Sequence, residues 1–518
     1  MRKRVLIVGG GTAGWLTAGY LAKRLAADLP AGAEVRLVES SAIGILGVGE
    51  GTFPTIRSTL STIGLGEADM IRRCGASFKQ GARFANWRRP AKGRTPHHYL
   101  HAFQEADERS GLELLPYWLL GAAGNEHWDE VATPQTKAAD AHRAPKLPTH
   151  ADYAAPLNYA FHFDAVALAE LLRDQAVASG VGHLVDKVTN VLLDGDGAIA
   201  GVETDANGLL TADLYIDCTG FRAELIGKAL GVPFKSCRDS LFCDSALALQ
   251  VPHATPEEEV ASYTISTAQR SGWIWDIALD RRRGIGHVYS SDHSSREEAE
   301  QALRDYIGPA ADGLEARHIP FTPGFREINW HMNCVAIGLS SGFFEPLEAT
   351  GIVFSEVAAS MVANLFPWGG DYETSARQFN ANMLRRYERA LDFIKLHYCL
   401  SDRDDSDFWR DNVRPDTVRD SLHELLDRWR FRPPNEMDVD TNVDIFPASS
   451  WQYVLYGLDW KTDLSAKRGA YRYFDDAVAA FAEVRRQADF AVRNLPSNRQ
   501  LLTIARQRDF GPEGKAAA

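Results

Sequence analysis

The chain has 518 residues, of which 45% are hydrophobic and 24% charged, so it can bury a large core and is too apolar to be disordered. Its formal net charge of -13, without a basic stretch interleaved with aromatic residues, argues against nucleic acid as a partner. Six cysteines without a CxxC pair fit a reducing compartment and predict no metal site.

The N-terminus resembles an export signal only superficially. Arg2, Lys3 and Arg4 precede an apolar stretch, but that stretch is rich in glycine, and cleavage would delete a nucleotide-binding motif. No uninterrupted apolar run approaches the ~18 residues that a bilayer span needs. We therefore expect a soluble, cytoplasmic protein with no membrane partner.

The first elements predicted are a strand, a turn, a helix and a second strand. Residues 5–8 are a β-branched run, residues 15–25 have helical spacing, and residues 34–39 suggest the next strand. The turn reads Gly9-Gly10-Gly11-Thr12-Ala13-Gly14. This order of elements is the one in which a glycine-rich turn binds a dinucleotide.

Each glycine of that motif has a physical role. Gly9 would permit the tight turn, Gly11 would let the backbone approach a pyrophosphate, and Gly14 would let the helix pack closely on the strand. Glu39 ends the second strand, where it would accept hydrogen bonds from ribose hydroxyls. The alternative is a turn that binds nothing, but the flanking elements and Glu39 favour a nucleotide site.

The middle of the chain alternates turns with strands. Residues 125–157 predict an irregular surface excursion, and Asp164 is placed to cap a helix that ends near residue 179. Residues 187–217 predict hairpins that lead into Asp217-Cys218-Thr219-Gly220. A strand ending in this way recurs where FAD-binding folds return to the cofactor, so it favours FAD over NAD.

Together these elements predict an α/β protein: a FAD-binding Rossmann-like (two-dinucleotide-binding) fold with a substrate-facing β-sheet and a helical C-terminal region. The strand-rich part covers residues 235–330. Long helices are predicted near residues 352–366, 373–400, 415–430 and 473–494. Because the cofactor segments are spread along the chain, we treat residues 1–400 as one interwoven FAD-binding and substrate module and residues 401–518 as a helical cap.

Five motifs occur in the order found in the flavin-dependent tryptophan halogenase family, which the sequence resembles over about residues 1–400. They are residues 9–14, 47–52, 78–80, 273–278 and 344–352. The resemblance implies that FADH2, oxygen and chloride or bromide form hypohalous acid, which then halogenates an electron-rich aromatic ring. Ala278 is a departure, because the family has proline there.

The resemblance implies Lys79 and Glu348 as the catalytic residues. Lys79 would donate a hydrogen bond to hypohalous acid or form a haloamine with it, whereas the alternative is a lysine in a surface ion pair. Glu348 would polarise the donor and accept the ring proton, with Glu345 as its rival; either glutamate could instead be a carboxylate at a helix N-terminus. Thr350 and Gly351 match the halide site.

Further cofactor contacts follow from the same resemblance. FAD would be held by the glycine motif and by residues scattered along the chain: Glu39, Gly49, Val188, Leu339 and Ile352. Ala349 stands where the family usually has serine. One hydroxyl contact is therefore lost beside Glu348, and we expect this to tune activity without abolishing it.

The resemblance also indicates which residues face the substrate or the tunnel: His101, Phe103, Trp273, Trp275 and Trp451. Phe103 could stack on an indole. Trp273 and Trp275 would project from one side of a strand and separate the substrate from the flavin, although two core tryptophans are the plainer alternative.

Free tryptophan is not the expected substrate. Family members that bind it hold its amino acid group with a tyrosine pair and a glutamate, whereas this chain has Trp451-Gln452 and then Leu458. A zwitterion without polar partners would pay several kcal/mol in desolvation. We therefore expect an indole other than free tryptophan, either free or attached to a peptide or carrier.

Two other functions compete with halogenation. An aromatic hydroxylase would need an NADPH site and open access to the flavin, and the absence of a second glycine motif and the Trp273–Trp275 wall disfavour it. A flavin-binding protein without turnover is disfavoured by Lys79 and Glu348. The expected partners are a separate NAD(P)H-dependent flavin reductase and a small aromatic substrate; whether the chain forms a homodimer stays open.

Overall fold

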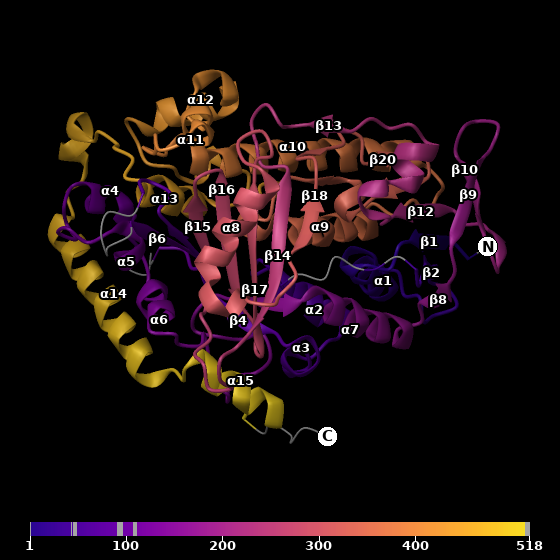
Figure 1. The fold of residues 1–518 in the computed structure, drawn as a ribbon, viewed down its shortest axis with the longest axis horizontal. Helices are drawn as coiled ribbons and strands as arrows, with labels where there is room; N and C mark the ends of the chain where they lie inside the picture. Colours follow the sequence, from indigo (N-terminus) through magenta and orange to yellow (C-terminus); the bar gives the residue numbers. More distant parts are fainter. Residues whose placement is uncertain (1, 43, 45–48, 91–96, 107–110, 513–518) are drawn as a thin grey trace. The chain divides into compact units, whose positions relative to one another are not determined.

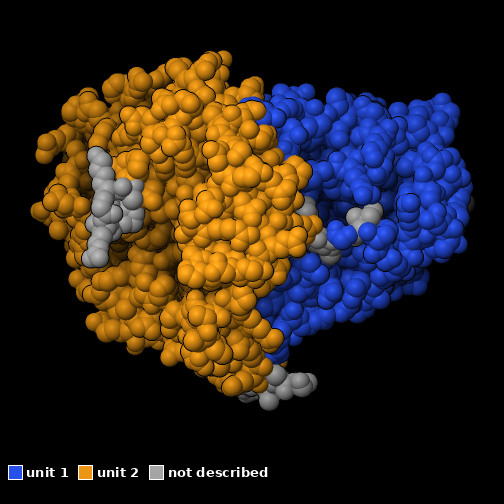
Figure 2. Space-filling view, in the orientation of Figure 1, with its two compact units in different colours: residues 1–75, 163–238, 321–388 blue, residues 76–162, 239–320, 389–518 orange. Residues whose placement is uncertain are grey.

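The computed structural model describes residues 2–42, 44, 49–90, 97–106 and 111–512. Figure 2 colours the two units into which the chain divides, each of them assembled from separate stretches of sequence. Unit 1 consists of Met1–Gly75, Phe163–Arg238 and Phe321–Glu388. Unit 2 consists of Ala76–His162, Asp239–Pro320 and Arg389–Ala518. Among the described residues, no helix is long and apolar enough to cross a bilayer.

Unit 1 is built on a six-stranded sheet with the order β20-β21-β12-β1-β2-β8. Its neighbouring strands are parallel, except that β20 runs antiparallel to β21. The strands are β1 (Arg4–Val8), β2 (Glu34–Glu39), β8 (Gly182–Val185), β12 (Leu214–Asp217), β20 (Trp330–His331) and β21 (Cys334–Ala336). Because parallel strands end at the same edge, the turns after β1, β2, β12 and β21 gather there, as expected of a nucleotide-binding sheet.

Helices of unit 1 pack on this sheet and on one another. Helix α1 (Thr12–Arg24) contacts both α7 (Ala165–Ala178) and α9 (Thr350–Asn364), which Figure 1 shows beside it. Asp164 caps α7, since its carboxylate accepts hydrogen bonds from the backbone N–H groups of Val166 and Ala167. The predicted cap is therefore present.

Shorter elements complete unit 1. They are β3 (Gly49–Gly51), α2 (Ile56–Ile63), α3 (Glu67–Cys74), β9 (Val188–Leu193), β10 (Ile199–Thr204), β11 (Gly208–Leu210), η1 (Gly220–Arg222), η2 (Glu224–Ala229), β13 (Lys235–Ser236), β19 (Gly324–Phe325), η4 (Gly338–Ser340), β22 (Gly342–Phe343) and η5 (Leu347–Ala349). Strands β9, β10 and β11 form the predicted hairpins. Helix α10 (Tyr372–Cys399) begins in unit 1 and ends in unit 2.

Unit 2 contains a seven-stranded sheet with the order β18-β14-β17-β16-β15-β5-β6. Its pairs are antiparallel, except for β15 with β5. The strands are β5 (Gly81–Ala85), β6 (His98–Ala102), β14 (Ser245–Pro252), β15 (Thr264–Gln269), β16 (Gly272–Ala278), β17 (Arg282–Tyr289) and β18 (Arg317–Pro320). Beside it, β4 (Ser77–Lys79) pairs with β7 (Ala160–Asp164).

Helices surround the sheet of unit 2. The described ones are α4 (Leu114–Leu119), α5 (Trp128–Val131), α6 (Gln135–Asp140), α8 (Arg296–Ile307), α11 (Asp407–Asn412), α12 (Asp420–Trp429), α13 (Ala448–Gly457), α14 (Phe474–Asn494) and α15 (Asn498–Gln507). The expectation of an irregular excursion at residues 125–157 was incomplete, because α5 and α6 lie within it. Helix α12 starts later than the predicted residue 415, since Pro415 occupies a separate short 3-10 turn.

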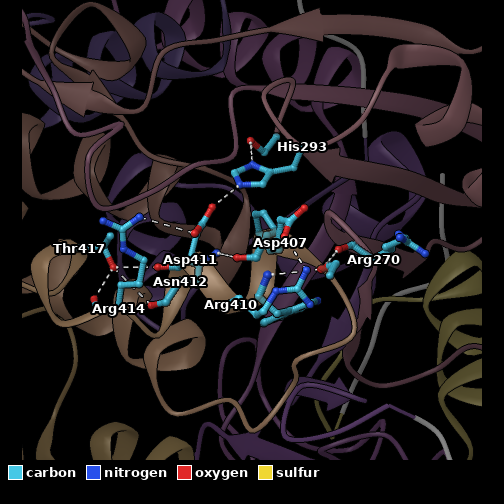
Figure 3. Close-up of polar contacts among 12 residues, drawn as sticks. Arg270, His293, Asp407, Arg410, Asp411, Asn412, Arg414 and Thr417 are labelled. Atoms are coloured by element: carbon cyan, nitrogen blue, oxygen red, sulfur yellow. Dashed lines mark hydrogen bonds and ion pairs between the residues drawn. The ribbon is translucent and has the colours of Figure 1, made fainter.

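A polar cluster attaches α11 to the loop after β17 (Figure 3). His293 contacts Asp411 through Nε2 at 3.1 Å and Ser290 through Nδ1 at 2.8 Å. Ser290 is completely buried, so this serine, histidine and aspartate give a substrate no access to a nucleophile. We assign the cluster to packing.

Candidate active site

The glycine motif forms a tight turn between β1 and α1 in unit 1. Gly9 has a φ of 111°, and a Cβ atom there would lie 2.2 Å from the carbonyl oxygen of Cys218. A Cβ on Gly14 would lie 2.0 Å from the carbonyl oxygen of Gly9. Beside Gly11, by contrast, no atom of the described residues other than its near neighbours in the chain lies within 4 Å of that position, so a ligand could approach the backbone there. The turn thus has the shape that a pyrophosphate requires.

Glu39 lies against this turn. Its Oε1 is 2.8 Å from Nε2 of His183, and a Cβ atom on Gly10 would lie 1.7 Å from its Oε2. The carboxylate is therefore placed at the carboxyl edge of the sheet, where a ribose would meet it. His183 was missed in the sequence, because it belongs to β8, whose pairing with β2 has no local signal.

Strands distant in sequence bring three more turns to the same edge. Backbone N–H groups donate from Cys218 to Val8 at 2.9 Å and from Ile337 to Asp217 at 3.0 Å. Asp217 is fully buried, and its carboxylate accepts hydrogen bonds from Thr219, Leu225 and Ile226. Its side chain therefore shapes the turn after β12, a role that the motif alone did not indicate.

The other expected FAD contacts also lie in unit 1. Gly49 begins β3, Val188 begins β9, Leu339 lies in η4, and Ile352 lies in the first turn of α9. Helix α9 contacts η4, and η4 follows β21, which places Leu339 and Ile352 near the sheet edge. The fit to FAD therefore rests on the glycine turn at residues 9–14 and on Glu39. Two residues of the motif at 47–52, Gly47 and Val48, lie outside the described residues.

Glu348 occupies an unusual backbone turn immediately before α9. Both Glu348 (φ 60°) and Ala349 (φ 51°) are left-handed, a conformation that costs a non-glycine residue roughly 1–2 kcal/mol. The chain therefore has two left-handed residues in succession before the helix that starts at Thr350, and Glu348 is buried at this point. The rival Glu345 is also buried, so burial alone does not separate them.

The expected halide residues start helix α9. Thr350 is its first residue and is buried; apart from the local helix backbone, no atom of the described residues lies within 4 Å of a Cβ position on Gly351. Backbone N–H groups in the first turn of a helix have no partner within that helix and attract anions. The geometry is compatible with a small anion at this point.

Lys79 lies in unit 2, at the end of β4, with only 2% of its surface exposed. Its Nζ is 5.2 Å from the centre of the Phe103 ring. The reading of Lys79 as a surface lysine is therefore wrong. His162 is opposite Ser77 on β7; burial lowers the pKa of His162 well below its ordinary value, and the nearby Lys79 lowers it further. The imidazole is neutral, and His162 adds no second positive charge beside Lys79.

His101 and Trp451 meet at a common aromatic residue, Phe393. The ring centres of His101 and Phe393 are 5.8 Å apart, and those of Trp451 and Phe393 are 4.9 Å apart. His101 Nε2 also contacts the Ser450 hydroxyl at 2.9 Å. The Arg389 guanidinium lies 4.8 Å from the Trp451 ring, so Trp451 belongs to a closely packed aromatic cluster.

Trp273 and Trp275 lie on one face of β16, as their spacing predicts. Their ring centres are 6.4 Å apart in an edge-to-face arrangement, and both side chains are buried. A Cβ atom on Gly286 would overlap the Trp275 ring, so this glycine makes room for the indole. The indole nitrogen of Trp275 has no hydrogen-bond partner among the described residues. This packing is compatible with both interpretations of the tryptophan pair, a separation between substrate and flavin and a pair of core residues.

Within the residues that the structure describes, no group of three histidine, cysteine or acidic side chains is arranged to hold a metal ion. The expected cofactor, halide and glutamate residues all belong to unit 1, whereas Lys79 and the expected substrate residues belong to unit 2.

Comparison with known proteins identifies the family. A family model described as tryptophan halogenase matches residues 4–471. Tryptophan 6-halogenase SttH from Streptomyces toxytricini is 37% identical over 530 residues, covering 98% of both chains. A tryptophan halogenase structure from Shewanella frigidimarina NCIMB 400 has a TM-score of 0.94 at 38% identity and covers 99% of both chains. Tar14, a tryptophan C-6 flavin-dependent halogenase from taromycin biosynthesis, has a TM-score of 0.91 at 37% identity, covering 98% of this chain and 100% of Tar14.

These matches confirm the family, the α/β fold class and the halogenase activity that the motifs implied. The chain belongs to the tryptophan halogenase family of flavin-dependent enzymes.

Proposed function

We propose that this enzyme uses FADH2, oxygen and chloride or bromide to form hypohalous acid, and that it halogenates an indole other than free tryptophan. The observation that carries the proposal is the burial of Lys79: a basic side chain with 2% exposure lies 5.2 Å from the Phe103 ring. Burying a cation costs free energy, and ionisable groups in such surroundings are enriched at functional sites; donating a hydrogen bond to a neutral oxidant is the role proposed for Lys79.

Unit 1 would prepare the oxidant. The glycine motif, Glu39, Gly49, Val188, Leu339 and Ile352 would hold the flavin, and Thr350 and Gly351 would hold the halide. Bound reduced flavin would give two electrons to oxygen, and oxygen would take two more from the halide as hypohalous acid and water form. A separate NAD(P)H-dependent reductase would provide the reduced flavin.

Unit 2 would hold the oxidant and the substrate. Lys79 Nζ would donate a hydrogen bond to the oxygen of hypohalous acid, which polarises the bond between oxygen and halogen. A ring carbon then takes the halogen, the halogen–oxygen bond breaks, and the hydroxyl leaves as water with a proton from Lys79. Glu348 would then accept the ring proton, and the loss of this proton restores the aromatic ring.

The argument against free tryptophan rests on helix α13. The Gln452 side chain donates to the carbonyl of Pro434 at 2.9 Å, and the Tyr453 hydroxyl donates to the carbonyl of Gln104 at 2.8 Å. The Tyr456 hydroxyl is 2.9 Å from that of Thr462. These polar groups are already used inside the protein, so they do not offer a clamp for an amino acid group. Bare indole, a larger indole, or an indole in a peptide or on a carrier suits the site better.

The test supplies the purified enzyme with FAD, a flavin reductase, NADH, oxygen and bromide. Free tryptophan, indole, tryptamine and a tryptophan-containing peptide are compared, and products are analysed by mass spectrometry. The expected product shows a bromine isotope pattern that disappears in Lys79→Ala and is strongest for the indoles without a free amino acid group. A product that gains one oxygen atom would instead indicate a hydroxylase, and preference for free tryptophan would refute the substrate assignment.

A further inference from the structure

The backbone that carries Lys79 is held by a residue from the C-terminal helix α15. Asn498, the first residue of α15, is completely buried. Its side-chain nitrogen donates to the carbonyl oxygens of Phe78 and Val260, each at 3.3 Å. Both contacted atoms are acceptors, so the amide nitrogen must be the atom that faces them. Phe78 immediately precedes Lys79 in β4.

The start of α15 is fixed by backbone contacts with residues 142–144. The Asn498 N–H donates to the carbonyl of His142 at 2.8 Å, and the Ala144 N–H donates to that of Pro496 at 2.9 Å. Between these two residues, the carbonyl of Arg143 accepts a hydrogen bond from the Gln80 side chain at 2.7 Å. The residues on both sides of Lys79 are therefore anchored to the same region.

A buried ion pair attaches the rest of α15. Asp280 is buried, and its carboxylate pairs with Arg499 at 3.0 Å and with Arg506. Arg499 also donates to the backbone carbonyl of Asp280 at 2.7 Å. Asp280 follows β16, and Ser77, two residues before Lys79, donates through its hydroxyl to the Ala278 carbonyl at 2.5 Å. Helix α15 and strand β4 thus share one support.

We propose that Asn498 is a positioning residue for Lys79. The inference rests on the proposed role of Lys79 in halogenation. Strand β4 is only three residues long, so pairing with β7 fixes its backbone less firmly than a long strand would be fixed. The Asn498 amide supplies an additional constraint one residue before the Lys79 side chain. Asn498 would therefore act on the reaction through the placement of Lys79, without touching the substrate.

The test separates positioning from stability by measuring coupling, which is the amount of halogenated product per FADH2 consumed. Asn498→Leu removes the donor at similar volume, and Asn498→Gln keeps an amide. Arg506→Gln is the matched control, because it weakens the attachment of the same helix without touching β4. FAD affinity, the rate of FADH2 oxidation, thermal unfolding and free hypohalous acid, trapped with a 1,3-diketone, are measured alongside.

We expect Asn498→Leu to bind FAD and oxidise FADH2 at the parental rate. Its coupling should fall about tenfold, since small misplacements of a catalytic group cost this much or more, and free hypohalous acid should rise. Asn498→Gln should recover part of the coupling. Arg506→Gln should unfold at a lower temperature with parental coupling.

Parental coupling in Asn498→Leu would overturn the inference, as would an equal loss of coupling in Arg506→Gln. If Asn498→Leu does not fold, Asn498→Ser is measured and interpreted in the same way. Lys79→Ala separates a failure of the proposed role of Lys79 from a failure of the positioning role of Asn498. If its coupling is parental, the proposed role of Lys79 fails; if its coupling is lost while that of the Asn498 variants is not, only the positioning role fails.

Discussion

The carboxyl group of Glu356, on α9, accepts a hydrogen bond of 2.6 Å from the hydroxyl of Thr59, on α2. Glu356 is 4% exposed, and its burial raises the pKa of the carboxyl group from 4.5 to about 8. The contact joins the helix that starts at Thr350 to the helix that follows Thr52. Near neutral pH, the Glu356 carboxyl group is therefore protonated in most molecules.

Stability should therefore depend on pH through Glu356. A carboxyl group whose pKa is higher in the folded than in the unfolded state stabilises the fold fully below about pH 4.5, and this contribution is lost as the pH rises through about 8. Glu356→Gln cannot ionise. It should unfold at a higher temperature than the parent at pH 8, and the advantage should shrink towards pH 5. Thermal unfolding at both values checks this, and a pH-independent difference would contradict it.

Two glycines of the β1 turn should respond differently to alanine. A methyl group at Gly14 would overlap the Gly9 carbonyl, whereas one at Gly11 would meet no described residue beyond its near neighbours in the chain. Gly14→Ala should therefore lower both the unfolding temperature of the FAD-free protein and its affinity for FAD. Gly11→Ala should leave the unfolding temperature unchanged and weaken FAD binding at least about tenfold, because the methyl group would occupy the pyrophosphate position. Calorimetry and flavin fluorescence titration measure the two effects.

The two buried glutamates before α9 should differ in their effect on turnover. Glu348→Gln should lower kcat by about 100-fold, the usual effect of losing a general base, and leave FAD affinity unchanged. Glu345→Gln serves as the matched variant and should retain most of the activity. Single-turnover kinetics with preformed FADH2 measure the halogenation step, and a larger loss in Glu345→Gln would show that the roles are reversed.

Backbone strain at Ala349 predicts an unusual effect of glycine. Ala349 is left-handed at φ 51°, so Ala349→Gly should raise stability by up to about 1 kcal/mol, after the greater freedom of glycine in the unfolded chain is subtracted. Ala358→Gly is the control in the interior of α9, the helix that follows Ala349, and should destabilise by about 1 kcal/mol. Urea unfolding compares the two midpoints, and shifts of the same sign would argue against strain.

The sequence predicts local features of the fold well where one short segment contains the whole signal. The turn from Gly9 to Gly14, the Asp164 cap and the shared face of Trp273 and Trp275 are local patterns. Short α5 and α6 were missed because each is too short to show helical periodicity among prolines.

Long-range pairings could not be read from the sequence. The contact of His183 with Glu39 depends on the pairing of β8 with β2. The left-handed turn at Glu348 had no glycine or asparagine to signal it. The contact of Asn498 with Phe78 joins residues 420 positions apart. The assignments of Lys79 and Glu348 came from family resemblance, and their roles in catalysis stay predictions.

Because each unit is composed of three separate stretches of sequence, no single cut yields either unit as a continuous polypeptide. A chimaera that takes unit 2 from another halogenase would need three grafts made together, at residues 76–162, 239–320 and 389–518. Exchanging one graft alone would pair foreign strands with native ones, such as β5 with β15. Recombination libraries whose crossover points lie at these unit boundaries should therefore contain more folded members than libraries with a single crossover point.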